Sequence, residues 1–246
     1  MHSSQRAPGT PDSGATRATR TTRHAPALKP LRLNAVPALA ALALLTVPQL
    51  ALAQSPGYYV GLHAGANDLK HWPASVGFGA GVKAQGRLTL DHGANIGLAV
   101  GRRTENARFE FEYQRGRFQL RGTDLGSVGS SASGAGHYET FLFNADRVLP
   151  VNGALAAYVG GGLGWGSVSF PSAGSAGGCN CFGSASGNGL AYQGRVGLEY
   201  TLGNGPNLYL QAGWISLPGG SSGGTPGVEY PRRGTATLDA GVRLRF

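Results

Sequence analysis

The amino-acid sequence predicts an all-β fold, a closed antiparallel β-barrel of eight strands that crosses a membrane. Eight segments of about ten residues alternate between apolar and polar positions, which is the pattern of transmembrane barrel strands. The links between these segments are alternately short and long. After residue 53, no stretch holds even a dozen consecutive apolar residues, so only a closed barrel could satisfy the backbone inside a membrane.

The composition favours strands over helices. Among 246 residues there are 42 glycines, and charged residues make up only 13%, which is unlike a helical soluble enzyme. The net charge of +9 would suit a nucleic-acid-binding protein. However, residues 1–53 hold six basic residues and one acidic residue, which accounts for +5 of this charge. The aromatic residues fall on the apolar stripes and not among basic residues, so we expect no nucleic-acid partner.

The N-terminal region has the three parts of a secretory signal peptide. Residues 1–34 are basic, residues 35–47 ("AVPALAALALLTV") are uncharged and apolar, and the triplet "ALA" at 51–53 fits a cleavage site. We therefore expect residues 1–53 to be removed and the barrel domain to cover residues 54–246. An uncleaved membrane anchor and a transit peptide are the alternatives, and the long basic part leaves the true start codon open.

The first three strands are predicted from an alternation that begins just after the cleavage site. Residues 57–67 ("GYYVGLHAGAN") and 93–103 ("GANIGLAVGRR") place most of their large apolar side chains at even positions. In residues 107–120, the stretch "RFEFEYQ" alternates aromatic residues with glutamates. The alternation then slips near Gly116, where we predict a β-bulge.

The five later strands keep the same pattern, and the last one ends the sequence. Its residues "LDAGVRLRF" place an apolar side chain at every second position. This strand would pair with the first strand, which closes the barrel and removes both sheet edges. The five segments are residues 137–149, 154–168, 189–201, 207–216 and 235–246.

The links between the strands indicate which end of the barrel lies outside the cell. Short periplasmic turns that alternate with long external loops are the arrangement of bacterial outer-membrane barrels. Within the first long link, residues 76–82 and 86–91 could extend strands or form a further hairpin, which would give ten strands. The short links are 104–107, 150–153 and 203–206, and the long links are 68–92, 121–136, 169–188 and 217–234.

The two faces of the predicted strands differ in polarity. Outward positions near mid-strand are apolar, where a Lys or Arg that faces lipid would cost about 2–4 kcal/mol. Inward positions carry both signs of charge, and side chains just fill the interior of an eight-stranded barrel. We therefore expect a salt-bridged plug that includes His63, with a narrow water-filled path as the alternative. The predicted lumen network consists of Glu110, Glu112, Asp146, Arg195, Glu199, Asp239, Arg243 and Arg245.

Five motifs, taken in order, resemble the eight-stranded outer-membrane barrel family, which includes the outer membrane protein A transmembrane domain, outer membrane protein X and the opacity-type surface antigens. They are "GYYVGLHAGA", "RFEFEYQ", "YVGGGLGWG", "GRVGLEYTL" and "LDAGVRLRF", and the resemblance covers about residues 55–246. In that family the barrel-assembly machinery reads the last strand, which implies an assembly signal at Phe246. We expect no peptidoglycan-binding domain, because nothing follows the last strand here.

The predicted external loops contain two further features. Cys179 and Cys181 lie in the third long link, and two cysteines in an exported protein normally form a disulfide. Because a C-x-C bridge is tight, free or intermolecular thiols and a metal or redox site are alternatives. Basic loop residues would form charge-assisted hydrogen bonds with lipopolysaccharide phosphates. These residues are Lys70, Lys83, Arg87, Arg121, Arg232 and Arg233.

No arrangement of residues predicts catalysis. His137 and Glu139 begin the fourth strand beside Ser130, Ser131 and Ser133, but no spacing fixes a nucleophile beside a base. The stretch "GGGLG" lacks the Lys and the following helix of a phosphate-binding loop. We therefore expect a protein that is not an enzyme and that holds no cofactor or metal.

The expected function is structural or interactive. A monomeric barrel of the outer membrane would support the envelope and contact an unknown extracellular ligand through its loops. A small porin-like channel and a lipid A-modifying enzyme are the alternatives. A soluble, lipocalin-like periplasmic barrel would need polar outward stripes, and the outward stripes of this sequence are apolar.

Overall fold

The computed structural model describes residues 57–176, 179–203 and 205–246. The predicted signal peptide and its cleavage site lie outside these described residues. Within the described part of the chain, no helix is long and apolar enough to cross a membrane. The strands are β1 (Gly57–Asp68), β2 (His71–Gly77), β3 (Lys83–Arg103), β4 (Ala107–Leu125), β5 (Val128–Pro150), β6 (Leu155–Phe170), β7 (Gly174–Ala176), β8 (Cys179–Phe182), β9 (Ala185–Thr201), β10 (Asn207–Leu217), β11 (Gly220–Ser221), β12 (Gly227–Tyr230) and β13 (Arg233–Arg245).

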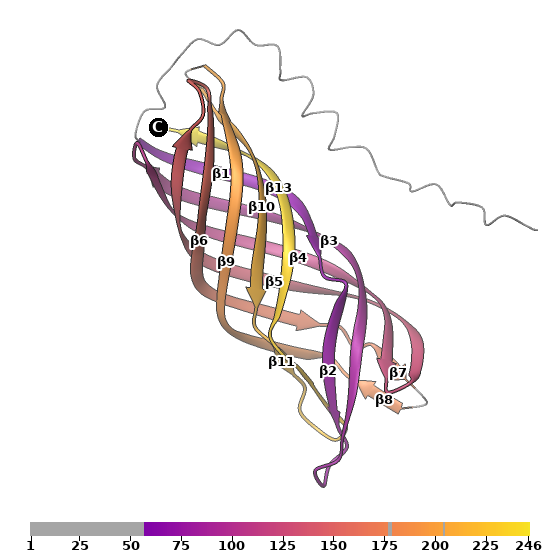
Figure 1. Ribbon diagram of the computed structural model, residues 1–246. Coiled ribbons are helices and arrows are strands. Elements are labelled where there is room, and N and C mark those ends of the chain that lie inside the picture. Colours follow the sequence, from indigo (N-terminus) through magenta and orange to yellow (C-terminus); the bar gives the residue numbers. More distant parts are fainter. Residues whose placement is uncertain (1–56, 177–178, 204) are drawn as a thin grey trace, which may run out of the picture. The chain divides into compact units, whose positions relative to one another are not determined.

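Eight long strands close into a barrel (Figure 1). The ring runs β1–β3–β4–β5–β6–β9–β10–β13 and returns to β1, and every pairing is antiparallel. The closing seam joins β1 to β13, from Tyr59 opposite Arg245 to Asp68 opposite Ala236. The prediction of eight barrel strands is therefore confirmed. The ten-stranded alternative is wrong, because β2 pairs beyond the end of β1 and does not enter this ring.

Much of what the sequence predicts as long loops is strand. β3 begins at Lys83, ten residues before the predicted start, and β4 and β5 are joined by a turn of only two residues after Leu125. The predicted loop 121–136 is therefore mostly a hairpin. Its stretch "VGSSASGAG" is composed of small residues that are as compatible with a strand as with a loop, so composition alone misplaces it.

Short strands continue the barrel wall beyond the ring. β2 pairs with β3 and with β12, β12 pairs with β11, and β11 meets β9 where Ser221 lies opposite Ser186. These strands extend the wall past the ends of β1, β10 and β13, at the end of the barrel away from the C-terminus (Figure 1). We call this region the external half: β2, β7, β8, β11, β12 and the adjoining parts of β3, β4, β5, β6 and β9.

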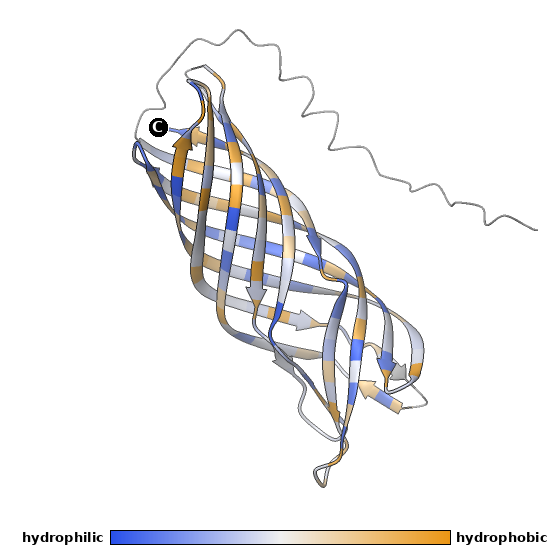
Figure 2. Ribbon diagram, in the orientation of Figure 1, coloured by the Kyte–Doolittle hydropathy of each residue, from blue (hydrophilic) through white to orange (hydrophobic). Residues whose placement is uncertain are grey.

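The predicted bulge near Gly116 does not lie in β4. The pairing of β4 with β5 is continuous from Ala107 to Leu120, and the irregularity near Gly116 lies on β3, whose register with β4 shifts between Asp91, opposite Gln119, and Ala94, opposite Arg117. Phe118 and Leu120 point inward on the same face as the glutamates earlier in β4. The apolar residues of β4 change from odd to even positions because the barrel interior changes from polar to apolar along the strand. Figure 2 shows how hydrophilic and hydrophobic residues alternate along the long strands.

Candidate functional site

A buried ion-pair network fills the barrel near its short-link end. Arg195 on β9 lies at its centre, with Nη2 2.5 Å from Glu110 Oε1, Nη1 2.7 Å from Glu112 Oε2 and Nη2 2.7 Å from Asp146 Oδ2. All four side chains are at most 1% exposed. The four residues come from three strands, β4, β5 and β9, so the network ties β9 to the part of the barrel wall formed by β4 and β5.

Glu199 forms a second centre in the same network. Its Oε2 accepts from Nη1 of Arg108 at 2.8 Å and from Nη1 of Arg243 at 2.9 Å, and Arg103 pairs with its Oε1. Arg108 also lies 2.7 Å from Asp146, which links the two centres. A buried charge is costly unless it is paired and hydrogen-bonded, and here each of these carboxylates has at least one guanidinium partner.

The structure brings six of the eight predicted lumen residues into this network. Asp239 is buried but lies outside it, with only an amide hydrogen bond of 3.3 Å from Gln211. Arg245 is half-buried and donates to Asn207 at 2.7 Å. Arg108 also belongs to the network but is not among the predicted lumen residues, although it lies on the same face of its strand as Glu110 and its parity indicates an inward position.

Aromatic side chains support the guanidinium groups. Cζ of Arg243 lies 3.6 Å from the ring centroid of Tyr209, and Cζ of Arg108 lies 4.1 Å from that of Tyr158. Such cation–π contacts stabilise a cation that has left water. Tyr59 donates a hydrogen bond of 2.5 Å to Glu110, which joins an aromatic residue of the lumen to the ion-pair network.

Glycines make room for the large side chains of the lumen. Gly97 lies opposite His63 in the register, Gly116 opposite Tyr138, and Gly197 opposite Tyr158. In each pair, the ring covers the place where a glycine Cβ would stand. Large side chains that cover glycines on a neighbouring strand are a known device of barrel construction.

The external half has an apolar core instead of a polar one. Trp72 is fully buried, its ring lies 4.8 Å from Phe170 in an edge-on contact, and its Nε1 donates to the Pro231 carbonyl at 2.8 Å. Phe170 stacks on Tyr230 at 4.1 Å. Burial raises the pKa of the Tyr230 hydroxyl, so this group stays neutral. The outer end of the lumen is therefore closed by packed hydrophobic side chains.

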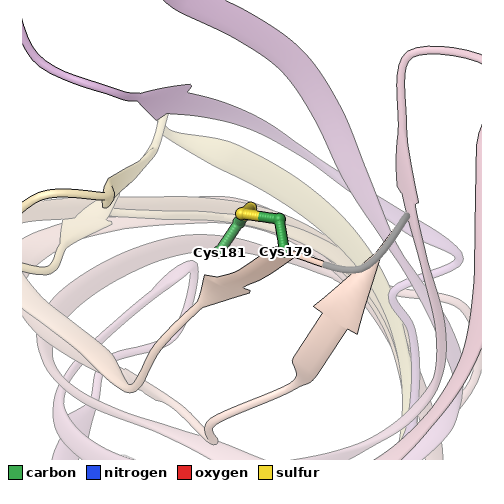
Figure 3. The surroundings of a disulfide bond; sticks show 2 residues. All are labelled: Cys179 and Cys181. Atoms are coloured by element: carbon green, nitrogen blue, oxygen red, sulfur yellow. A yellow bond between two sulfur atoms is a disulfide. The ribbon is translucent and has the colours of Figure 1, made fainter.

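The two cysteines are joined by a disulfide on β8 (Figure 3). Their Cα atoms are 5.2 Å apart. Cys181 and Phe182 are buried in the apolar core of the external half, so the bridged segment packs against the rest of that core. Among the described residues, no group of three or more His, Cys, Asp or Glu residues could hold a metal ion.

Most of the predicted lipopolysaccharide-binding cations already have acidic partners. The exceptions are Arg232 and Arg233, at the junction of β12 and β13. Arg232 lies over the ring of Tyr192 at 5.6 Å and donates to Ser216 at 3.3 Å, and Arg233 is exposed. The paired cations are Lys70 with Asp68 at 3.1 Å, Lys83 with Glu229 at 3.9 Å, Arg87 with Asp124 at 2.8 Å, and Arg121 with Asp91 at 3.1 Å.

The residues considered for catalysis do not meet. His137 lies opposite Arg117 and Ser169, whereas Ser130 and Ser131 lie further along the hairpin, opposite β4. Glu139 is paired with Arg115 at 3.3 Å. The lumen histidine, His63, is 4% exposed and shares a hydrogen bond of 3.1 Å with the Tyr209 hydroxyl, so it is enclosed by the plug.

A family model and one solved structure support this architecture. The family model described as "Outer membrane protein beta-barrel domain" matches residues 38–243. No curated protein matches the chain. Among solved structures, OprG from Pseudomonas aeruginosa is similar at 14% identity and a TM-score of 0.52, over 80% of this chain and 100% of OprG. Neisserial surface protein A is similar at 18% identity and a TM-score of 0.45, over 78% and 100% of the two chains. The outer membrane enzyme PagL is similar at 15% identity and a TM-score of 0.36, over 76% and 99%.

Proposed function

Because the chain belongs to the outer membrane protein beta-barrel domain family, we propose that it is a non-conducting barrel of the outer membrane with a structural and surface-contact role. The barrel would support the envelope through its lipid-facing wall. The external half would present a stable surface to extracellular ligands. The observation that carries this proposal is that side chains fill the lumen in two regions. Charged side chains fill it near the short-link end, and an apolar core fills it in the external half.

A path through the barrel would meet the two filled regions one after the other. A water-filled path would have to pass the network around Arg195, where four charged side chains are at most 1% exposed. It would then have to pass Trp72 and Phe118, which are both fully buried. The plug therefore supports the structural role over the channel role, which is the alternative function.

Planar-bilayer recordings test this proposal. The purified protein is expected to insert without a stable, sizeable open state, because both regions of the lumen are filled by side chains that are almost fully buried. A matched control is a porin of known conductance, reconstituted in the same lipid. Reproducible openings of the protein under these conditions would overturn the plug and favour the channel.

We further propose that Arg232 and Arg233 contact lipopolysaccharide phosphates. Arg232 lies over Tyr192, whose ring is 5.8 Å from that of Trp214, and both rings belong to the outward apolar surface. A cation just above interfacial aromatic residues is well placed for a phosphate of the outer leaflet.

The double variant Arg232→Gln, Arg233→Gln is expected to bind lipopolysaccharide about tenfold more weakly, because it loses charge-assisted hydrogen bonds. Binding can be measured by titrating the detergent-solubilised protein with lipopolysaccharide. Lys70→Gln is the matched control, since Lys70 already pairs with Asp68, and it should leave the affinity nearly unchanged. Equal losses in the two variants would contradict this role.

The remaining proposals concern partners and chemistry. We propose that the protein is a monomer surrounded by outer-membrane lipid, that Phe246 is read by the barrel-assembly machinery, and that a signal peptide directs its export. We also propose that it is not an enzyme. The separation of His137 from the serines of the β4–β5 hairpin supports this, because a nucleophile must lie within hydrogen-bond reach of its base.

A further inference from the structure

A groove on the lipid-facing surface of β3, β4, β5 and β6 has the size of a ligand site. Its volume is about 530 Å³, and small-molecule sites commonly measure about 300–1,000 Å³. Two aromatic pairs form much of its wall, Phe111 with Phe143 at 5.0 Å and Tyr113 with Phe141 at 4.8 Å. The other outward side chains along it are Leu98, Val100, Leu163 and Trp165. Every one of these side chains suits contact with an acyl chain.

Beyond this groove, towards the external half, β4 and β5 carry basic residues on the same outward face. The register runs from Tyr113 opposite Phe141 to Arg115 opposite Glu139, and then to Arg117 opposite His137. In the first of these polar pairs, Glu139 neutralises the charge of Arg115, from which it lies 3.3 Å away.

Arg117 differs from Arg115 and Arg121, the neighbouring outward cations of β4, which pair with Glu139 and Asp91. Its side chain is exposed, and no carboxylate of the described strands and loops lies within ion-pair distance of it. The partly exposed His137 lies opposite it on β5, and Ser169 follows on β6. A free guanidinium flanked by an imidazole and a hydroxyl is a set of donors that suits a phosphate.

From this juxtaposition we propose that the β3–β6 wall seats one lipid A molecule of the outer leaflet. An acyl chain lies in the groove between the two aromatic pairs, and a lipid A phosphate is bound by Arg117, with His137 and Ser169 as further donors. The charge complementarity selects a phosphorylated lipid, and the apolar groove selects an acylated one. This seat is distinct from Arg232 and Arg233, which lie at the junction of β12 and β13, and it does not require the lumen to be closed.

Native mass spectrometry of the detergent-solubilised full-length protein tests the seat. The probes are diphosphorylated lipid A and the same lipid after enzymatic removal of its phosphates. One tightly held lipid A per barrel is expected, with about tenfold weaker binding of the dephosphorylated lipid, because a charge-assisted hydrogen bond contributes roughly this factor. Equal binding of the two lipids would overturn the proposal.

Two variants test the phosphate-binding part and the acyl-binding part of the seat separately. Arg117→Gln removes the free cation, and Leu163→Trp fills the groove. Each is expected to lower lipid A binding about tenfold relative to the control Arg102→Gln, which removes an equally outward cation of β3 that lies over Tyr58. Heat-modifiable gel migration confirms that each variant is folded.

The outcomes distinguish this seat from the proposed function. If Arg117→Gln and Leu163→Trp bind lipid A as Arg102→Gln does, the seat is refuted. If only the Arg232→Gln, Arg233→Gln variant loses this one tightly bound lipid and Arg117→Gln keeps it, the seat at Arg117 is likewise refuted. Bilayer conductance of the unmodified protein would refute the closed lumen and leave the lipid seat standing.

Discussion

Replacing Arg195 with methionine is expected to lower the free energy of unfolding by about 3–5 kcal/mol, which is the loss typical of a broken buried ion pair. Arg195 contacts Glu110, Glu112 and Asp146, and all of them are buried. Methionine fills a similar volume but leaves these carboxylates with fewer cations. The cost therefore arises from the charges that remain in the barrel, and not from lost packing.

Urea unfolding of the barrel refolded in lipid vesicles measures this loss. The matched control is Arg115→Met, because Arg115 forms a single, partly exposed surface ion pair, and surface pairs contribute at most about 1 kcal/mol. Adding Glu112→Gln to Arg195→Met should recover part of the stability, since one uncompensated carboxylate is then removed. A midpoint for Arg195→Met equal to that of Arg115→Met would show that the network does not hold the lumen together.

Replacing Trp72 with alanine is expected to cost about 3–5 kcal/mol, as for other buried aromatic residues. Trp72 is in contact with Phe118 and Phe170 and closes the apolar core of the external half. Trp72 itself is on β2, which pairs with β3 beyond the end of β1 and lies outside the ring of eight strands. The loss should therefore appear as local opening of the external half while the ring of eight strands persists.

Limited proteolysis of intact vesicles with external protease would detect this opening. New cleavage is expected in β2 and in the segment around β12, with a protected fragment from the ring. Phe78→Ala is the control, because Phe78 is partly exposed near the turn between β2 and β3. If Trp72→Ala resists protease as Phe78→Ala does, the external half is not held by this core.

The lipid-facing part of the barrel could be predicted from the sequence because one local rule governs it. Along β4, apolar Phe109 and Phe111 face outward while Glu110 and Glu112 face inward, and all four positions follow from parity alone. In lipid the outward face must be apolar, so the sequence pattern and the structure carry the same information there.

The external half could not be predicted in the same way. Outside the membrane the rule reverses, so Phe118 faces inward and Arg117 faces outward. The sequence shows this reversal only as a slip in phase, which looks the same as a bulge. The partners across the sheet were also invisible: Arg87 and Asp124 are paired in space but separated by 37 residues in the chain.

Because glycines lie opposite large rings in the lumen, the residue at a single lumen position does not by itself determine how well the barrel is packed there. Opposite positions such as Gly116 and Tyr138 share one volume, and only their sum determines whether that layer of the barrel is full. Exchanging the two residues would transfer bulk to the neighbouring strand and leave the layer filled. The glycines and the large lumen residues of this sequence therefore act together, because each such glycine leaves the space that the ring on the neighbouring strand fills.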